Sequence, residues 1–414
     1  MENDFFALQV RDNYPDSSHP SSSIFVHNQI KGLDQLGVKN LVISPQPYIP
    51  NKMIEILRNI SFLNKYITSD MKKYHSSPKI GLEYYENIPI LRPSFIKFPS
   101  QYLFNFSFDS LSHSISEASF PYSADVIHAH FGQNGAASLE LKKKYRIPLV
   151  TSFYGYDSGR LSKKFGRIYE RLEEEGDIFL ALSHDMKNDL VNLGFSKHKI
   201  LVHHLGVDID NYKPSKVNRN KFVFLSLARL QKGKGIQFAI MAMKNIVLDH
   251  NDVELRIVGS GPYESNLRYL VRKLGLDKFI KFIDNISSPN SRAIVRSEMS
   301  QCDVFLLPTY TTKIPGGFRK EGTPVVLMEA QSCSKPCIST NHAGIPEVVI
   351  DSQTGFITKE KDVVELETKM RALIENKSLL KEMGLKARKH IKKNFNHKIQ
   401  IERLFKIYKK LHES

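Results

Sequence analysis

The sequence predicts an α/β fold of two domains, each a parallel sheet covered by helices. Short runs of β-branched and other apolar residues alternate with amphipathic segments along most of the chain, which is typical of parallel sheets flanked by helices. A chain of 414 residues is too long for a single hydrophobic core. We predict a first domain over 1–210, a linker over 211–220, a second domain over 221–395, and a C-terminal helix over 396–414 that returns toward the first domain.

The first domain is predicted to contain four buried strands and two helices. The strands are Lys39–Ser44, Asp125–His130, Pro148–Phe153 and Asp177–Ser183, and the helices are Ser23–Leu36 and Gly132–Tyr145. Two further segments, 51–67 and 95–115, mix apolar, aromatic and basic residues. Either segment suits an element that docks on a bilayer, but we favour helices packed on the core of this domain.

The second domain repeats the alternation of strands and helices. Its predicted strands are Lys221–Leu227, Val253–Gly259, Ile280–Ile283, Val304–Pro308 and Pro336–Thr340. Its predicted helices are Ile236–His250, Tyr263–Leu274, Pro324–Ser332 and Asp362–Asn376. Ligands of such domains bind beyond the carboxyl ends of the strands, so we expect the functional residues in the loops that follow them.

Composition indicates an ordinary soluble protein, with 41% hydrophobic and 25% charged residues. No apolar stretch approaches the 18 residues of a membrane helix, and the N-terminus shows no signal pattern. The three cysteines, Cys302, Cys333 and Cys337, suit a reducing cytoplasm. We interpret them as buried packing residues rather than zinc ligands, because no fourth ligand accompanies Cys333, Cys337 and His342.

The net charge of +16 lies almost entirely in the second half of the chain. Residues 1–215 hold 24 basic and 23 acidic side chains, and the remainder hold 35 and 20. From Lys377 onward there are 12 basic and 3 acidic residues. This basic end could be a solvated face or could meet an anionic membrane surface, and both interpretations stay open. Nucleic acid has little support, because Phe395, Phe405 and Tyr408 are spaced as helix core positions rather than as a stacking platform.

Two glutamates, Glu321 and Glu329, bracket the run GTPVVLM. A proline is favoured in the first helical turn, so we expect a helix to begin at Thr323 or Pro324 with its N–H groups open to an anion. A fully helical run would put the carboxylates roughly 12 Å apart, too far for a glycosidase pair. The spacing suits a ligand with a sugar at one end, a ribose at the other and a diphosphate between; a capped surface helix with two solvated acids is the alternative.

A basic turn and a glycine turn follow two of the predicted strands. Arg229 comes after the first strand of the second domain, and Lys234 lies in the glycine-rich turn beyond it. A guanidinium fork and an ammonium point charge together suit a diphosphate, although a plain basic turn would look the same. The turn at 259–262 lets a ligand approach the backbone closely. We expect both turns and the Glu321 segment to converge at one edge of the second sheet.

The order and spacing of these motifs resemble those of glycosyltransferase family 4. The second half contributes Arg229 with Lys234, the turn at 259–262, the glutamate pair and the segment NHAGIPE at 341–347. The first half agrees, with HAHFG at 128–132, TSFYGYD at 151–157, SHD at 183–185 and GVD at 206–208. The motifs are most similar to those of the exopolysaccharide, colanic-acid-type branch of the family.

The resemblance implies a GT-B fold, with two Rossmann-like, doubly wound domains facing a cleft. The first domain would be the acceptor side, and the second would bind a nucleotide sugar. The implied activity is that of a retaining hexosyltransferase without metal or other cofactor. It would transfer a sugar from a UDP- or GDP-linked donor to a growing surface polysaccharide or a lipid-linked saccharide, in the cytoplasm or peripherally on the inner face of the plasma membrane.

The resemblance also implies roles for single residues. Arg229 and Lys234 would hold the diphosphate and stabilise the leaving nucleotide, and Glu329 would accept hydrogen bonds from the ribose hydroxyls. Gly261 would let the backbone approach the nucleotide. His130 would reach the cleft from the first domain, near the donor sugar or the acceptor.

The segment that begins at Glu321 would hold the donor sugar. Glu321 would position the sugar together with the backbone N–H groups of Gly322 and Thr323. The helix that starts near Pro324 would add partial positive charge toward the diphosphate and so help to replace a cation.

The chain departs from the family pattern at several positions. Tyr154 stands where a histidine is usual, which puts one acceptor-side contact in doubt. Asp284-Asn285 replaces a glycine-bearing turn after the strand Ile280–Ile283, so we expect the contact to the base to differ there. Ser334 replaces a common glycine, which would be strained if its backbone is left-handed. Ser21–Ser23 replaces glycines beside the donor phosphate and could instead cap the following helix.

Three other interpretations of the sequence motifs are possible. Asp208-Ile209-Asp210 resembles the Asp-x-Asp metal motif of other glycosyltransferases, but it falls on the interdomain segment, so we reject a metal site. A GT-B partner subunit that binds a nucleotide sugar without transferring it would keep the fold. A nucleotide-sugar epimerase or hydrolase of the same architecture would convert the donor without any acceptor.

Overall fold

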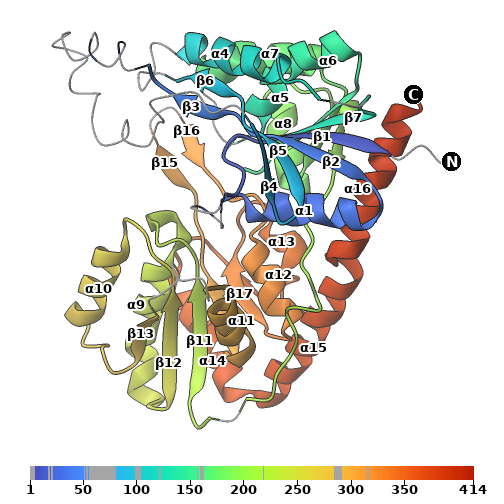
Figure 1. Cartoon of the computed structure of the whole chain (residues 1–414). Coiled ribbons are helices and arrows are strands. Elements are labelled where there is room, and N and C mark those ends of the chain that lie inside the picture. The colour runs from blue at the N-terminus through green and yellow to red at the C-terminus, as the bar shows by residue number, and fades with distance from the viewer. Residues whose placement is uncertain are drawn as a thin grey trace.

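The chain folds into two α/β lobes that lie one above the other (Figure 1). The computed structural model describes residues 5–16, 19, 22–50, 52, 55, 81–97, 104–120, 123–155, 157–158, 163–217, 219–283, 291–314 and 317–414. Each lobe has a mainly parallel sheet with helices on its faces, which confirms the predicted α/β class. Among the helices in this part of the chain, none is long and apolar enough to cross a membrane.

The N-terminal lobe is built on an eight-stranded sheet in the order β10-β9-β8-β7-β1-β2-β5-β4. Only the β4–β5 pair is antiparallel. The strands are β1 (Phe6–Val10), β2 (Lys39–Ile43), β4 (Leu82–Tyr85), β5 (Ile88–Leu91), β7 (Val126–His130), β8 (Leu149–Ser152), β9 (Ile178–Ala181) and β10 (Ile200–Val202), and a separate pair joins β3 (Gln46–Tyr48) to β6 (Ser94–Ile96). The helices are α1 (Ile24–Gln35), α4 (Phe104–Ser116), α5 (Gly132–Ala137), α6 (Leu139–Tyr145), α7 (Lys163–Glu175) and α8 (His184–Asn192).

The C-terminal lobe is built on a six-stranded, all-parallel sheet in the order β13-β12-β11-β14-β17-β18. The strands are β11 (Phe222–Leu227), β12 (Val253–Val258), β13 (Ile280–Ile283), β14 (Val304–Leu307), β17 (Cys337–Thr340) and β18 (Gly355–Thr358), and a small hairpin joins β15 (Thr312–Ile314) to β16 (Gly317–Arg319). The helices are α9 (Ile236–Asp249), α10 (Glu264–Lys273), α11 (Ser291–Gln301), α12 (Val325–Ser332), α13 (Ile345–Val348), α14 (Val363–Glu375), α15 (Lys377–Asn394) and α16 (His397–His412).

The predicted elements are present, with ends that differ by one or two residues. The main exception is the stretch Gly132–Tyr145, which is two helices because the chain breaks at Ser138. The sequence did not predict several other elements, which are the strands β1, β3, β4, β5, β6, β10, β15, β16 and β18 and the helices α7, α8, α11 and α13. The proposed boundaries at 210, 220 and 395 stay predictions, although the two sheets end at β10 and begin at β11 on either side of the linker.

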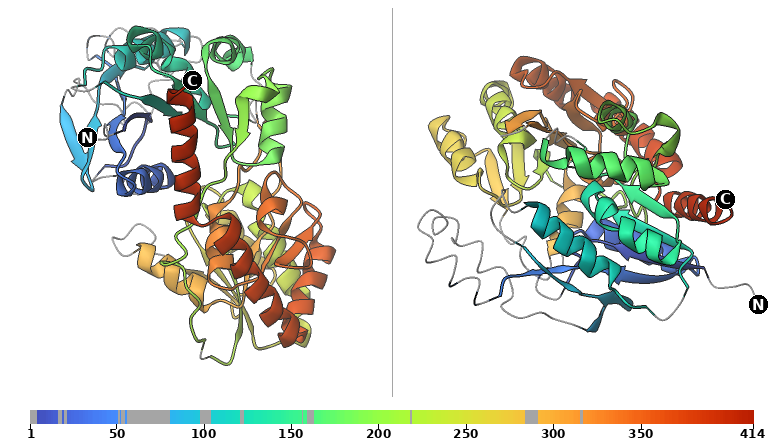
Figure 2. Two further views of the ribbon diagram at one scale, coloured as in Figure 1. Left: turned by 90° about the vertical axis from the view of Figure 1, so that its right-hand side faces the viewer. Right: turned by 90° about the horizontal axis from the view of Figure 1, so that it is seen from above.

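Two neighbouring segments of chain connect the lobes. Val207 forms an isolated bridge with Asn396, the Val207 N–H donates to the Phe395 carbonyl (2.8 Å), and the His397 N–H donates to the Val207 carbonyl (3.0 Å). Beyond this crossing, α16 leaves the C-terminal lobe and lies against α1 and β7 of the N-terminal lobe (Figure 2). Its buried residues Ile401 and Leu404 belong to the same apolar cluster as the inner side chains of the N-terminal sheet.

The aromatic segment 95–115 packs on the N-terminal lobe where the structure describes it. Phe95, Leu111 and Ile115 are buried in the core of that lobe, while Phe106 is exposed. Packing on the core is therefore the interpretation that fits these residues. The other segment, 51–67, lies outside the described residues apart from positions 52 and 55.

The three cysteines are free and buried. Burial raises the pKa of the thiols of Cys302, Cys333 and Cys337. All three belong to one apolar cluster of the C-terminal lobe, as predicted for packing residues.

Candidate functional site

A cavity of about 610 Å³ lies between the two lobes. It is at the carboxyl ends of β11 and β12, next to the point where the strand order of the C-terminal sheet reverses between β11 and β14, which is where ligands of such sheets bind. The N-terminal lobe contributes a largely apolar wall of Phe25, Tyr154, Leu182 and Leu205. The C-terminal lobe contributes Arg229, Lys234, Gly259–Gly261 and Glu321–Val326.

The loops after β11 and β12 hold each other in place and thereby position Arg229. The Leu230 N–H donates to the Ser260 carbonyl (2.9 Å), and the Tyr263 N–H donates to the Leu230 carbonyl (3.0 Å). A Cβ at Gly259 would lie 1.9 Å from the Ala228 oxygen, and one at Gly261 would lie 2.4 Å from the Leu230 oxygen. Both glycines are therefore required by backbone packing, whether or not a ligand also approaches Gly261.

Lys234 and Glu321, which both line the cavity, are paired with each other. Lys234 ends a 3-10 turn after β11, and its Nζ donates to Glu321 Oε1. No ion pair or hydrogen bond to another described residue is found for the Arg229 side chain, which lines the same cavity. These three residues give the cavity a net positive charge, so an anionic ligand would be attracted there.

The helix after Glu321 starts one residue later than predicted. Pro324 is the N-cap and α12 begins at Val325. Before it, the Thr323 hydroxyl donates to the Leu182 carbonyl of the other lobe (3.1 Å). A Cβ on Gly322 would lie 2.6 Å from the Tyr154 carbonyl, so the backbones of the two lobes touch at this glycine.

Glu329 lines a different cavity from Glu321. It borders a polar crevice of about 350 Å³ with Tyr212, Arg292 and Arg296, and Val325 lines both spaces. Tyr212 is hydrogen-bonded to the Glu329 carboxyl, and burial raises the pKa of Glu329 to about 7. The two glutamates therefore line separate cavities that share Val325. The ribose contact of Glu329 stays a prediction.

Comparison with known proteins gives the family. Residues 22–211 match the family described as Glycosyltransferase Family 4, and residues 208–390 match the family described as Glycosyl transferases group 1. The putative colanic acid biosynthesis glycosyltransferase WcaL of Escherichia coli (strain K12) is 30% identical over 298 residues, which cover 70% of this chain and 71% of WcaL.

The chain belongs to glycosyltransferase family 4. The amylovoran biosynthesis glycosyltransferase AmsK of Erwinia amylovora is 26% identical over 404 residues, 94% of this chain and 97% of AmsK. Among solved structures, Anabaena Alr3699/HepE in complex with UDP and glucose has a TM-score of 0.70 at 18% identity, covering 98% of this chain and 100% of HepE. That likeness confirms the predicted GT-B fold, and the family makes the chain a glycosyltransferase enzyme.

In this glycosyltransferase, His130 lies behind Tyr154 rather than in the cavity wall. His130 is fully buried; its Nε2 donates to Gln9 Oε1 (3.1 Å), and its Nδ1 accepts from the Tyr154 hydroxyl (2.7 Å). Burial lowers the pKa of His130, and His128 and Arg11 add to the effect. The imidazole is therefore neutral, and any influence on a ligand would pass through Tyr154, which occupies the place where the family usually has a histidine.

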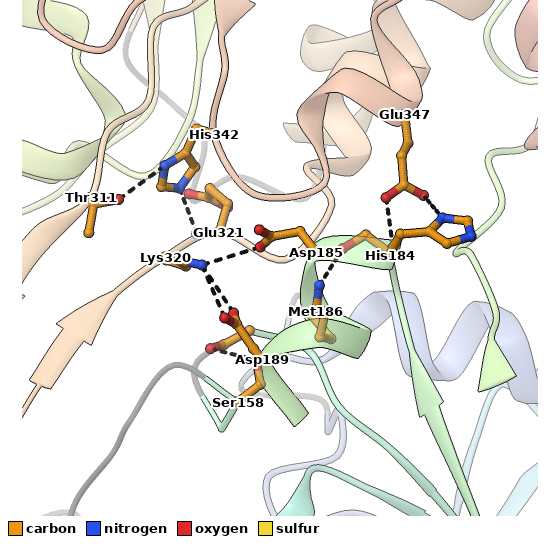
Figure 3. A network of polar contacts seen from close by, with 12 residues as sticks. Ser158, His184, Asp185, Met186, Asp189, Thr311, Lys320, Glu321, His342 and Glu347 are labelled. Carbon is orange, nitrogen blue, oxygen red and sulfur yellow. Dashed lines mark hydrogen bonds and ion pairs between the residues drawn. The ribbon is translucent and has the colours of Figure 1, made fainter. Parts of the chain in front are cut away.

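Contacts between the lobes flank the Glu321 segment (Figure 3). Lys320 Nζ lies 3.4 Å from Asp185 Oδ2 and 3.2 Å from Asp189 Oδ1, both on α8. The backbone N–H of His184, at the start of α8, donates to Glu347 Oε1 (2.7 Å). The sequence motifs contain His184, Asp185 and Glu347, but nothing in their spacing shows that they pair across the cleft.

Most of the other positions that drew attention in the sequence have local explanations in the structure. Ser334 is left-handed, with φ of 59°, as expected for a position that is usually glycine. Ser23 does not cap α1, contrary to one expectation; its hydroxyl accepts from Arg11 Nε (2.9 Å). Asp208 uses its carboxylate to accept the N–H groups of Asp210 (2.9 Å) and Asn211 (3.0 Å). Asp284-Asn285 lies outside the described residues.

No group of three or more metal-binding side chains is found among the residues that the structure describes. The predicted assignment of no metal and no cofactor remains a prediction, because it concerns what the working enzyme requires.

Proposed function

We propose that this glycosyltransferase is a retaining enzyme that transfers a sugar from a nucleotide-sugar donor to a growing exopolysaccharide or its lipid-linked precursor, without a metal ion. The observation that carries the proposal is that Arg229, Lys234 and Glu321 line one interlobe cavity beside the start of α12. A cavity of about 610 Å³ is within the size range of small-molecule sites.

The cations support a diphosphate ligand held by protein alone. An arginine fork and a lysine ammonium form charge-assisted hydrogen bonds to phosphate oxygens. The unpaired N–H groups at the start of α12 add partial positive charge. Lys234 and Glu321 form an ion pair. A nucleotide sugar in the cavity would bring its phosphate oxygens to Lys234 and a sugar hydroxyl to Glu321. Their pairing keeps both side chains in place before the donor arrives.

The cavity wall supports retention of configuration. An inverting transfer needs a protein base to take the acceptor's proton. Of the described residues that line the cavity, Glu321 is the one carboxylate, and it is paired with Lys234. Tyr154 is a poor candidate for that base, because burial raises the pKa of its hydroxyl and so keeps it protonated. A retaining transfer on the leaving-group side can pass the proton to the departing phosphate instead.

The relatives support the substrate classes. WcaL and AmsK are named for the biosynthesis of colanic acid and amylovoran, and HepE has been crystallised with UDP and glucose. By similarity, we propose a UDP- or GDP-linked sugar as donor and a saccharide or lipid-linked saccharide as acceptor. The largely apolar wall of the N-terminal lobe would face that acceptor.

We also propose that the enzyme works in the cytoplasm against an anionic membrane surface. The lysines of α15 and α16 are mostly exposed, whereas Phe395 and Tyr408 are buried, so the exposed side of these helices is basic. Vesicles of phosphatidylglycerol and phosphatidylcholine should sediment the protein at low salt and release it in about 0.5 M salt, where screening is strong. Equal recovery in the supernatant with and without vesicles would contradict membrane binding.

The transfer itself can be tested with a panel of UDP-, GDP- and ADP-sugars. Thermal shifts would first identify the donor, since a ligand that binds the folded state raises its melting temperature. Nucleotide release would then be measured with and without a lipid-linked acceptor, in EDTA, and the anomeric configuration of the product determined by NMR. We expect acceptor-dependent release and an unchanged anomeric configuration.

Two matched lysine variants test whether transfer takes place in the interlobe cavity. Lys234→Ala should abolish release, whereas Lys232→Ala, an exposed lysine of the same turn, should not. Release without any acceptor would indicate a hydrolase or epimerase, and binding without release across a wide acceptor panel would indicate a binding subunit. Inversion of the anomeric configuration would overturn the retaining mechanism.

A further inference from the structure

We propose that His342 and Glu360 are positioning residues that hold the backbone of Glu321 in the place needed to bind the donor sugar. The proposal rests on the proposed role of Glu321 in binding that sugar. Neither His342 nor Glu360 lines the cavity, so both would act through Glu321 rather than by touching the substrate.

The hydrogen bonds of His342 to the Glu321 backbone and to Glu360 fix the ring in one tautomer, and the Thr311 hydroxyl lies 3.4 Å from Nδ1 of the ring. Its Nε2 lies 3.0 Å from the backbone nitrogen of Glu321. A backbone N–H can only donate, so Nε2 is the unprotonated, accepting nitrogen. Its Nδ1 lies 2.7 Å from Glu360 Oε1 and donates to that carboxylate. The side chain is 1% exposed, and Figure 3 shows the ring between Thr311 and the Glu321 backbone.

Glu360 is held in turn by a third loop. The Thr311 N–H donates to Glu360 Oε2 (3.2 Å), and the Thr311 hydroxyl donates to Oε1 (3.2 Å). Thr311 follows β14, His342 follows β17 and Glu360 follows β18. Three neighbouring strand ends of the C-terminal sheet are thus tied by side chains to the backbone of one residue.

Glu321 is consequently held at two points. Its carboxylate accepts from Lys234, on the loop after β11, and its N–H donates to His342. Without the second contact, the backbone of Glu321 could shift while its carboxylate stayed paired with Lys234 and Thr323 stayed bonded to Leu182. Because a misplacement of about 1 Å can cost a factor on the order of 100 in rate, such a shift should reduce kcat. Binding of the nucleotide part, which depends on other residues, should change little.

Two substitutions of His342 separate positioning from simple packing. His342→Gln keeps an accepting oxygen and a donating nitrogen, whereas His342→Leu fills similar space with neither. We expect His342→Leu to lower kcat about 10–100-fold with little change in the Kd for the free nucleoside diphosphate. His342→Gln should recover most of that loss. Glu360→Leu should resemble His342→Leu, and Glu360→Gln should be milder because its amide oxygen can still accept.

A readout that does not need activity tests the contact itself. Amide hydrogen exchange at Glu321, measured by mass spectrometry with fragmentation to single residues, should be protected in the wild type and in His342→Gln. It should be at least about tenfold faster in His342→Leu, because the N–H has lost its acceptor. Thermal melting of each variant establishes that it is folded.

The outcomes distinguish this proposal from the function on which it rests. Unchanged exchange at Glu321 in folded His342→Leu would overturn the positioning role, whatever the enzyme does. A loss of kcat that His342→Gln fails to recover, or that is matched by an equal loss of nucleotide affinity, would overturn it too. Altered exchange in a protein whose wild type transfers no sugar would support the contact and count against the proposed function.

Discussion

At the scale of single residues, burial sets the ionisation of Glu329. The pKa of its carboxyl rises from 4.5 to about 7 because the side chain is removed from water, and the hydrogen bond from Tyr212 only partly offsets this. The folded protein therefore binds this proton more tightly than the unfolded chain. The associated stability is fully present below the unfolded pKa and is lost as the pH rises from about 4.5 to about 7.

Glu329→Gln should remove the loss of stability at higher pH, because an amide has the same shape as the carboxyl group and cannot ionise. We expect the free energy of unfolding of the variant to exceed that of the wild type by less than about 1 kcal/mol at pH 5 and by about 3 kcal/mol at pH 8, since each pKa unit of the shift corresponds to about 1.4 kcal/mol. Urea denaturation from pH 5 to pH 8 measures the difference. Parallel curves for the two proteins would show that Glu329 is as well hydrated in the fold as in the unfolded chain.

Tyr154 lines the cavity and also donates a hydrogen bond to a buried histidine. Its hydroxyl is the donor to His130 Nδ1 (2.7 Å), and Tyr154→Phe would leave that buried nitrogen without a partner. A lost partner for a buried polar group costs about 1–3 kcal/mol, so we expect Tyr154→Phe to lower the free energy of unfolding by that amount. Tyr84→Phe, at a tyrosine that is 67% exposed, is the control and should change it by less than about 0.5 kcal/mol.

The sequence located the cationic and acidic residues but not their partners. Arg229, Lys234 and Glu321 follow strands whose carboxyl ends meet, so their shared cavity could be expected from strand order alone. The ion pair of Lys234 with Glu321 and the place of His130 behind Tyr154 depend on side-chain packing across 87 and 24 residues. No local pattern encodes contacts of that separation.

At the scale of elements, glycines set how closely the lobes approach. A Cβ at Gly322 would lie 2.6 Å from the Tyr154 oxygen, and one at Gly155 would lie 2.7 Å from the Gly322 nitrogen. The loop after β8 and the loop before α12 therefore meet backbone to backbone. This contact closes the cavity on the side of Glu321.

Gly322→Ala should hold the lobes apart while leaving each lobe folded. We expect a larger radius of gyration by small-angle X-ray scattering and a loss of sugar transfer, with an unchanged far-ultraviolet circular dichroism spectrum. Gly166→Ala provides the control, because a Cβ there meets no atom within 4 Å. An unchanged radius together with full activity would mean that the loop yields locally and that this contact does not govern closure.

A polar residue inside the strand explains why the sequence did not predict β1. β1 is central to its sheet, yet it carries Gln9, which is fully buried. Its amide donates to Asn40 Oδ1 (3.0 Å) and its oxygen accepts from His130 Nε2 (3.1 Å). By contrast, the sequence predicted β11, β12, β13, β14 and β17 closely, because the burial of these strands shows in their apolar composition. A polar residue inside a strand becomes acceptable only when its partners are known.

At the scale of the whole molecule, α16 joins the lobes into one unit. Leu404 and Tyr408 are fully buried against residues of the N-terminal sheet, and the Tyr408 hydroxyl lies 2.5 Å from His128 Nδ1. A helix that follows the C-terminal lobe in sequence thus completes the core of the other lobe.

Leu404→Ala should therefore weaken the N-terminal lobe although the residue lies in the last helix. Truncating a fully buried leucine costs about 2–5 kcal/mol, and the loss should appear as earlier hydrogen exchange in β1, β7 and α1. Lys406→Ala, on the exposed side of the same helix, should leave exchange unchanged. Protection lost only within α15 and α16 would show that α16 does not support that lobe.

We propose above that the diphosphate of a nucleotide sugar is held in the interlobe cavity by protein groups without a metal ion, chiefly by Arg229 and Lys234. Isothermal titration of the best donor from the UDP-, GDP- and ADP-sugar panel, in EDTA, tests it most directly. We predict the same Kd with EDTA and with Mg²⁺, and binding at least about 100-fold weaker in Arg229→Ala/Lys234→Ala, since each charged contact is worth roughly 1.5–3 kcal/mol. Binding that needs Mg²⁺, or that survives the double substitution unchanged, would contradict it.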